Sequence, residues 1–317
     1  MDLAALRAGF GRLSLAELLP RSSKSWAQKA IADFASEDHV GASLAAGLTV
    51  EHLAKFRLLK SDPTALAQDR KGRALSEAFL SGAGHPEVRN LGDVRTIQLA
   101  EAVKAAFRVY DLGGPPEADL TALVDGRNSA GHIGYADFAM STNSVASMVR
   151  LLRLLLGGPE AASAWMGIDG DLESALAHLP HVCLDEWGVP AFPPGFPFDV
   201  LARASVGARL WRSAAHWKEL CERIPLSQLR IIAVASTDDP VPDGLLRTCP
   251  TGGHLAWFEA EDEEDEDSEY DENVRFMRRY LDRVDCPLCG LRLQGRDELD
   301  IVGVGEDFGT FVWSREH

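Results

Sequence analysis

The stretch Val145-Ala146-Ser147-Met148-Val149-Arg150-Leu151-Leu152-Arg153-Leu154-Leu155-Leu156, followed by Gly157-Gly158-Pro159, indicates how the N-terminal half of the chain folds. Its apolar side chains recur with the 3.6-residue period of an amphipathic helix, and the Gly-Gly-Pro sequence cannot continue that helix. The pattern therefore predicts a long helix with one face in a hydrophobic core.

The same pattern extends upstream, and residues 25 to 156 are predicted to be helical. One helix is expected from Asp38 to about Lys60. A second is expected from near Asp93 until the Gly-Gly-Pro-Pro sequence at 113 to 116, and a shorter third begins at Asp119. With residues 145 to 156 these make four amphipathic helices, which predicts a helical bundle.

The composition changes after residue 158. The Pro-rich run 189 to 197 suits a linker, a helix is predicted from 198 to 222 with Trp211 and Trp217 buried, and residues 229 to 235 suit a strand. Residues 275 to 283 are expected to be a basic, helix-like stretch. The sequence thus predicts a mainly α chain in three parts: a helical bundle at 1–158, a Pro-rich linker and helical connector at 159–228, and a small α+β module at 229–317.

Composition and charge restrict the class of protein. The 317 residues are 46% hydrophobic and 25% charged, as in globular proteins. No apolar run approaches the ~20 residues of a membrane helix, and charged residues interrupt the first twenty positions, so we expect a cytoplasmic protein with no membrane partner. Eleven acids at 259–272 supply −11 of the formal net charge of −16. This run is expected to be a solvated loop or, alternatively, a mimic of nucleic acid that attracts a basic partner.

The sequence Arg127-Asn128-Ser129-Ala130-Gly131-His132 lies between two predicted helices. RNA cleavage through its own 2′-hydroxyl needs a group that moves protons near neutral pH and a fixed cation that holds the phosphate. His132 suits the first role and Arg127 can bind phosphate oxygens. Asn128 can orient the imidazole or a phosphate oxygen. The same residues are also compatible with a surface helix end, where they would cap carbonyl groups.

These features resemble the HEPN superfamily of helical-bundle ribonucleases, whose RNxxxH motif matches Arg127, Asn128 and His132. The segment Val50-Glu51-His52-Leu53-Ala54-Lys55 is similar to that family's apolar-Glu-x-Leu-x-Lys pattern in the first core helix. The resemblance covers about residues 25 to 158. It implies a HEPN-type bundle and a metal-independent endoribonuclease, with these three motif residues at a catalytic site in the interface cleft of a homodimer.

The resemblance also implies a biological role as a toxin or as an effector of stress or antiviral defence, with RNA as substrate. A protein partner or an antitoxin is then a further expected partner. Two other functions stay open. One is a non-catalytic HEPN scaffold that binds a protein partner through the C-terminal module, and the other is a regulator that senses a nucleotide in the same cleft.

The C-terminal cysteines suggest a metal site. Cys286-Pro287-Leu288-Cys289-Gly290 is similar to a zinc-ribbon knuckle, with two thiolates three positions apart on a tight turn. Gly252 stands where a second knuckle would carry its second cysteine, so Cys249 and His254 are the further ligands predicted for a Cys3His zinc site, with a hairpin between 254 and 286. The alternative is a ribbon that has lost its metal and is held by apolar packing. Cys183 and Cys221 are expected to be buried thiols.

Overall fold

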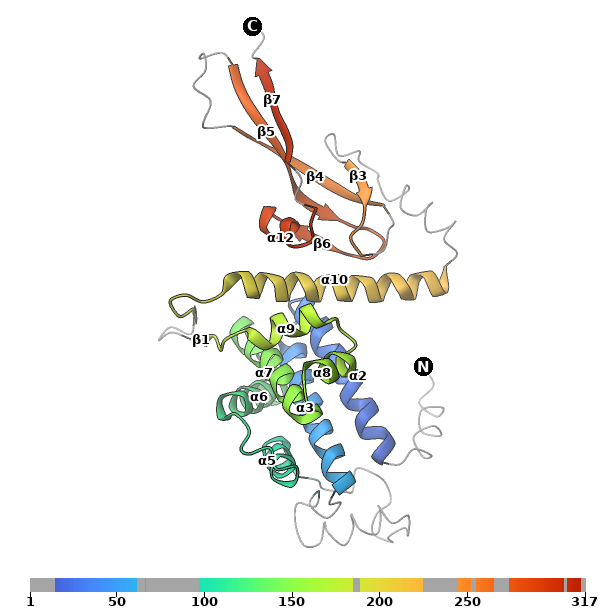
Figure 1. Ribbon diagram of the computed structural model, residues 1–317, viewed down its shortest axis with the longest axis vertical. Coiled ribbons are helices and arrows are strands. Elements are labelled where there is room, and N and C mark those ends of the chain that lie inside the picture. The colour runs from blue at the N-terminus through green and yellow to red at the C-terminus, as the bar shows by residue number, and fades with distance from the viewer. Residues whose placement is uncertain are drawn as a thin grey trace. The chain divides into compact units, whose positions relative to one another are not determined.

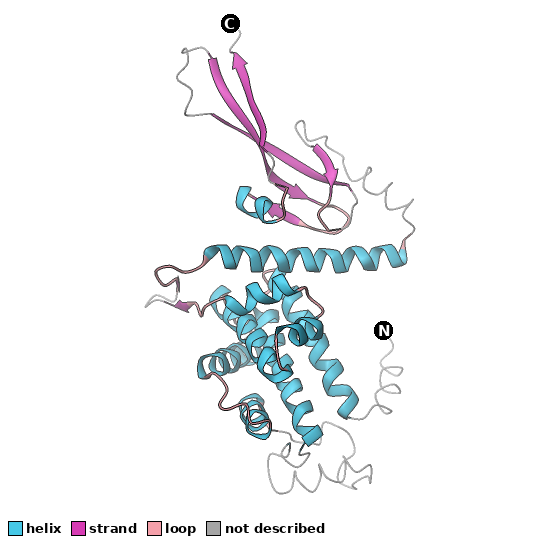
Figure 2. Cartoon of the chain, in the orientation of Figure 1, coloured by secondary structure: helices cyan, strands magenta, loops and turns pink. Residues whose placement is uncertain are grey.

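The computed structural model describes residues 15–61, 66, 97–184, 189–224, 245–251, 255–264, 274–304 and 307–314. The chain divides into two compact units, Met1–Pro197 and Phe198–His317, and this boundary falls inside the connector predicted at 159–228. The described residues are mainly helical, as predicted (Figures 1 and 2). None of the described helices is both long and apolar enough to cross a membrane.

Helix α3 (His39–Ser61) is the central helix of the first unit. The Asp38 carboxylate accepts a hydrogen bond from the Gly41 N–H at 2.9 Å and caps its start, as expected from the sequence. Four helices pack around α3, and the small residues Ala42, Ala45, Ala46 and Gly47 let them approach its backbone closely. These are α2 (Leu15–Ala35), α5 (Leu99–Val109), α6 (Glu117–Asn128) and α7 (Phe138–Leu156).

Helix α7 confirms the periodic stretch on which the bundle was predicted. It begins at Phe138 because the Asp137 carboxylate accepts a hydrogen bond from the Met140 N–H at 2.7 Å, and it ends at Gly157, whose φ of 91° favours glycine. Its apolar face is fully buried, including Val145, Met148, Val149, Leu152 and Leu155. Burial of that face stabilises the bundle mainly through the hydrophobic effect.

Two short helices after α7 complete the first unit. Helix α8 (Pro159–Met166) and helix α9 (Gly170–His178) both pack against α7, and Asp169 caps α9. A two-stranded antiparallel sheet of β1 (Cys183–Leu184) and β2 (Pro190–Ala191) follows.

The second unit combines one long helix with an antiparallel sheet (Figure 1). Helix α10 (Phe198–Arg223) confirms the helix predicted from 198 to 222, with Trp211 and Trp217 partly rather than fully buried. The sheet order is β3-β4-β5-β6, and β7 also pairs with β5. The strands of the sheet are β3 (Leu245–Thr248), β4 (Leu255–Glu264), β5 (Val274–Asp285), β6 (Arg292–Gln294) and β7 (Asp307–Ser314). The short helix α12 (Arg296–Ile301) lies between β6 and β7 in the sequence.

The structure corrects two predictions in this unit. Residues 275 to 283 belong to strand β5 and are not helical, and residues 259 to 264 of the acidic run belong to strand β4 rather than to a loop. The register explains both differences, because Glu259 pairs with Arg283, Asp262 with Arg279 and Glu263 with Arg278. Opposite charges at paired positions favour such a ladder. Residues 229 to 235 and 265 to 272 lie outside the described part of the chain.

Candidate functional site

Helix α3 and helix α6 are joined by an ion pair between the two segments on which the family resemblance rests. The Glu51 Oε2 atom lies 2.8 Å from the Arg127 Nη2 atom, and the Lys55 Nζ atom donates to Glu51 Oε1 at 2.5 Å. The Glu51 carboxylate is buried and the Arg127 side chain is partly exposed. One buried carboxylate therefore compensates two cations and fixes the guanidinium of Arg127 at the edge of the bundle.

Glycines at two positions make room for this arrangement. A Cβ atom at Gly47 would lie 2.8 Å from the Cβ atom of Arg127 and 3.0 Å from its Cδ atom, so the stem of Arg127 lies directly on α3 at Gly47. A Cβ atom at Gly126 would meet the Ser144 Oγ atom at 2.2 Å. The close approach of α6 to both α3 and α7 therefore requires glycine at these two positions.

His132 lies on a π-helical turn, Ser129–Ile133, which directly continues α6. The turn closes when the Gly134 N–H donates to the Ser129 carbonyl, five residues earlier, and Gly134 ends it with a φ of 70°. Because a π-turn holds more residues than an α-turn, it shifts the position of His132 around the helix axis relative to that in a regular α-helix. Such turns occur frequently at functional sites.

The three motif residues differ in their surroundings. Arg127 is held on α3, whereas Asn128 and His132 are exposed. Within the described part of the chain, no side chain or carbonyl group makes a hydrogen bond with the His132 ring. Next to it, the apolar side chains of Ile133 and Tyr135 are 77% and 55% exposed. The motif therefore presents one fixed cation and one accessible imidazole, beside apolar surface that the single chain does not cover.

A second histidine, His52, lies beside Glu51 on α3. Burial lowers the pKa of its imidazole, the Glu51 carboxylate opposes that shift, and the cations Lys55 and Arg127 add to it. The Ser22 hydroxyl lies 2.9 Å from its Nδ1 atom. These surroundings favour the neutral form of the His52 imidazole, and sequence reasoning did not assign this residue a role.

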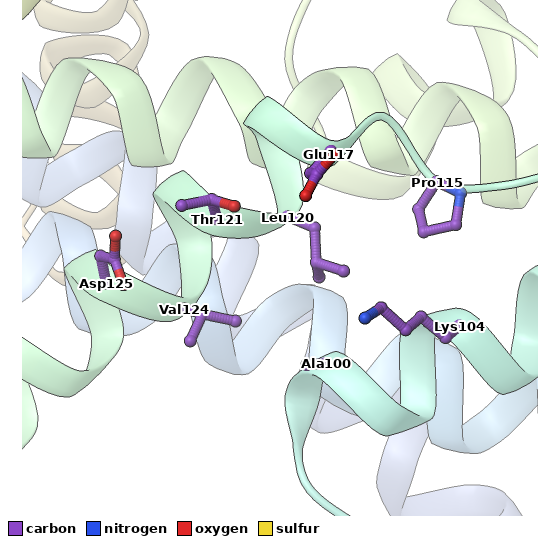
Figure 3. A pocket seen from close by; sticks show the side chains of 8 residues that line it. All are labelled: Ala100, Lys104, Pro115, Glu117, Leu120, Thr121, Val124 and Asp125. Carbon is purple, nitrogen blue, oxygen red and sulfur yellow. The ribbon is translucent and has the colours of Figure 1, made fainter.

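A cavity of about 420 Å³ lies between α5 and α6 (Figure 3). Leu120 and Val124 belong to its apolar lining, and Lys104, Glu117 and Asp125 bring one ammonium group and two carboxylates to it. Two carboxylates against one cation disfavour a phosphate ligand. The cavity is therefore not part of the phosphate site predicted at Arg127.

A separate polar network around Asp119 joins α6, α7 and the segment that follows α9. The buried carboxylate of Asp119 accepts hydrogen bonds from Ser147 at 3.0 Å and from Arg150 Nε at 2.8 Å, and it lies 2.9 Å from the His181 Nε2 atom. Burial raises the pKa of Asp119. The contacts with His181, Arg150 and Ser147 together lower that pKa by more than burial raises it, so the net shift is downward. Arg150 also donates to the carbonyls of Ala177 and Leu179. This network holds the chain after α9 against the bundle and leaves Arg150 fully engaged.

Three of the four predicted metal ligands lie together in the second unit. The sulfur atoms of Cys249, Cys286 and Cys289 all lie within 4.8 Å of one another, and all three residues are buried. The Cys289 N–H faces the Cys286 sulfur at 3.5 Å, and Gly290, with a φ of 71°, turns the chain back, as predicted for a knuckle. The fourth predicted ligand, His254, lies outside the described residues. The cluster can hold a metal ion.

Shared contacts among the sulfurs separate the acidities of these thiols. Contacts with Cys249 and Cys286 lower the pKa of Cys289, whereas contacts with Cys249 and Cys289 raise the pKa of Cys286. Sequence reasoning missed Thr251, whose Oγ1 atom is 3.1 Å from two of the sulfurs. The prediction for Cys183 and Cys221 was wrong, since both thiols are exposed. They lie on elements that present them to solvent rather than to a core.

In comparisons with known proteins, no family model matches the chain, and no match is found among curated proteins or solved structures.

Proposed function

We propose that the first unit is a HEPN-type endoribonuclease that cleaves RNA without a metal ion. The observation that carries this proposal is the contrast between Arg127 and His132. Glu51 holds the guanidinium and the stem of Arg127 lies on α3 at Gly47, while the imidazole is exposed one π-turn further along. A fixed cation stabilises charge that develops on a phosphate, and an accessible imidazole exchanges protons with the 2′-hydroxyl and the leaving oxygen.

The roles divide among the motif residues in the following way. Arg127 binds the scissile phosphate with the edge of its guanidinium that Glu51 does not engage. His132 acts as general base or general acid, and Asn128, exposed beside it, orients the ring or a phosphate oxygen. The buried Glu51 carboxylate acts through Arg127 and is a positioning residue, because it holds the guanidinium in one place before RNA binds.

We propose that two copies of the chain pair through the surface formed by Ile133 and Tyr135, which brings two motifs to one cleft. Exposed apolar side chains beside a polar site are typical of an interface. The test is the molar mass in solution. Ile133→Asp should convert the dimer to a monomer. The matched variant Leu154→Asp changes an exposed apolar residue on a different element, α7, and should leave the dimer intact.

Expression in growing cells tests the proposed activity. Wild-type protein should slow growth and fragment cellular RNA, and both effects should be lost in Arg127→Ala and in His132→Ala. This outcome is also what a toxin or defence effector would give. Intact RNA in cells that contain a correctly folded wild-type dimer would refute the ribonuclease and favour a non-catalytic scaffold.

We also propose that the second unit holds a structural zinc ion through Cys249, Cys286 and Cys289. Buried thiols within 4.8 Å of one another are a donor set that zinc prefers. Elemental analysis of the purified chain should find roughly one zinc per molecule. Cys286→Ser should remove it, and Cys221→Ser, at an exposed cysteine remote in sequence from the knuckles, should retain it. Absence of zinc from the wild type would favour a ribbon held by packing alone.

A further inference from the structure

Thr251 lies against the cysteine cluster, on the knuckle that lacks a second cysteine. Its Oγ1 atom is 3.1 Å from the Cys249 sulfur and 3.1 Å from the Cys289 sulfur. Those two sulfurs are 3.6 Å apart. The hydroxyl oxygen therefore contacts two of the three sulfurs at once, from a side chain that is only partly buried.

One of these separations matches an edge of a tetrahedral metal site, and the other two are hydrogen-bond distances between the Thr251 hydroxyl and the sulfurs. A zinc ion with bonds of about 2.3 Å to sulfur places two sulfurs roughly 3.8 Å apart. An oxygen ligand at about 2.1 Å from the ion would lie roughly 3.6 Å from each sulfur. The Cys249–Cys289 separation already fits, and the Thr251 oxygen needs to move outward by only about 0.5 Å to meet the same geometry.

The described residues offer no other side chain of a usual metal ligand as the fourth donor. Among the described residues, no additional cysteine, histidine, aspartate or glutamate joins the three sulfurs. Gly252, at the usual position of the missing cysteine, has no side chain. Thr251 is thus the residue of the degenerate knuckle that brings an oxygen donor to the cluster.

We propose that the Thr251 hydroxyl is the fourth donor of the metal site, which makes it a site of three thiolates and one oxygen rather than the Cys3His site expected from the sequence. This inference rests on the zinc site proposed above. A neutral hydroxyl is a weaker ligand than a thiolate, so the fourth position limits the affinity of the whole site. A thiol at residue 251 would then strengthen it.

The experiment measures zinc affinity of the full-length chain by competition with a chelating dye, and the absorption of the Co²⁺-substituted protein. Thr251→Val, which keeps the shape and removes the hydroxyl, should weaken zinc binding and alter the absorption of the Co²⁺-substituted protein, because the fourth donor is lost. Thr251→Ser should bind as the wild type does. Thr251→Cys should bind more tightly and raise the thiolate-to-cobalt absorption by roughly one third, because four thiolates replace three. His254→Ala should change the affinity less than about twofold.

The variants separate this inference from the zinc proposal itself. Wild-type protein that binds zinc, with binding lost in His254→Ala and unchanged in Thr251→Val, would overturn the inference and assign the fourth position to His254. Wild-type protein that binds neither zinc nor Co²⁺ would overturn both proposals. Only Thr251→Val removes the hydroxyl, so its comparison with Thr251→Ser tests the oxygen ligand. If Thr251→Val does not fold, an affinity of Thr251→Cys no higher than that of the wild type would overturn the inference.

Discussion

The Glu51 Oε2 atom lies 2.8 Å from the Arg127 Nη2 atom. This ion pair connects α3 and α6, and its two residues are 76 positions apart in the sequence. Lys55 contacts the other carboxylate oxygen. The carboxylate is therefore the fixed point around which the cationic part of the candidate site is organised, and the predictions below start from it.

Replacing Glu51 with Gln should release Arg127 without changing the size of the side chain. We expect a loss of about 2–3 kcal/mol in the free energy of unfolding, because two cations lose their buried counter-charge. RNA cleavage should fall by about 100-fold, since the guanidinium is no longer held in place. Urea denaturation and initial cleavage rates measure the two effects.

The matched control is Glu173→Gln, which breaks the buried pair between Glu173 and Arg153 on α9 and α7. It should cost a comparable free energy of unfolding and leave the cleavage rate unchanged. Equal loss of cleavage in both variants would show that Glu51 acts only through stability.

Replacing Gly47 with Ala should displace Arg127 directly. The added Cβ atom would lie 2.8 Å from the Cβ atom of Arg127, so α6 must move away from α3. We expect a net cost of about 1–2 kcal/mol, since strain exceeds the gain in helix propensity. The control Gly170→Ala meets no atom within 4 Å and should leave thermal stability unchanged or slightly raised. A stable Gly47→Ala variant with full activity would contradict the packing described for Arg127.

The Asp119 network predicts a pH dependence of stability. The pKa of Asp119 is lowered in the folded state, so the unfolded state binds a proton first as the pH falls. Its contribution is therefore complete above about pH 4, the pKa range of an unperturbed aspartate, and is lost as the pH falls through the lower folded value. Asp119→Asn should cost about 2–4 kcal/mol at pH 7 and progressively less below about pH 4. Urea denaturation from pH 2 to 7 checks this, and a difference that is constant with pH would contradict it.

Removal of the metal should destabilise the second unit selectively. Without an ion, three buried thiols contact one another where bonds to zinc would hold β5, β6 and the Cys249 turn together. Incubation with a strong chelator should therefore increase hydrogen exchange at Leu281, Val284 and Leu293. Exchange at Leu151 and Leu152 of α7 should not change. Equal exchange with and without chelator in the second unit would count against a structural ion.

The sequence predicted the bundle where local pattern determines structure. Periodic apolar residues and a Gly stop identified α7, and Asp38 identified the start of α3. Residues 275 to 283 were predicted to be helix-like, whereas they belong to strand β5. What decides its structure is pairing with acidic positions on β4, which is a long-range contact that local spacing does not reveal.

The candidate site was predictable in part for the same reason. Arg127, Asn128 and His132 were marked by their motif, and the knuckle by its two cysteines. The contact between Glu51 and Arg127 joins two distant segments, and only the family pattern drew attention to Glu51. Thr251 was missed because threonine is not a usual metal ligand. Its place on a knuckle without a second cysteine is the signal that would have indicated it.

The central claim is that His132 and Arg127 cleave RNA through its 2′-hydroxyl, and one measurement tests it most directly. Purified wild-type protein is incubated, in excess chelator, with an end-labelled RNA and with the same RNA that carries a single 2′-deoxy residue at the cleavage position. The account predicts cleavage of the all-ribose strand by the wild type, none of the substituted strand at that position, and no cleavage by His132→Ala. Cleavage of the 2′-deoxy position, or full activity of His132→Ala, would contradict it.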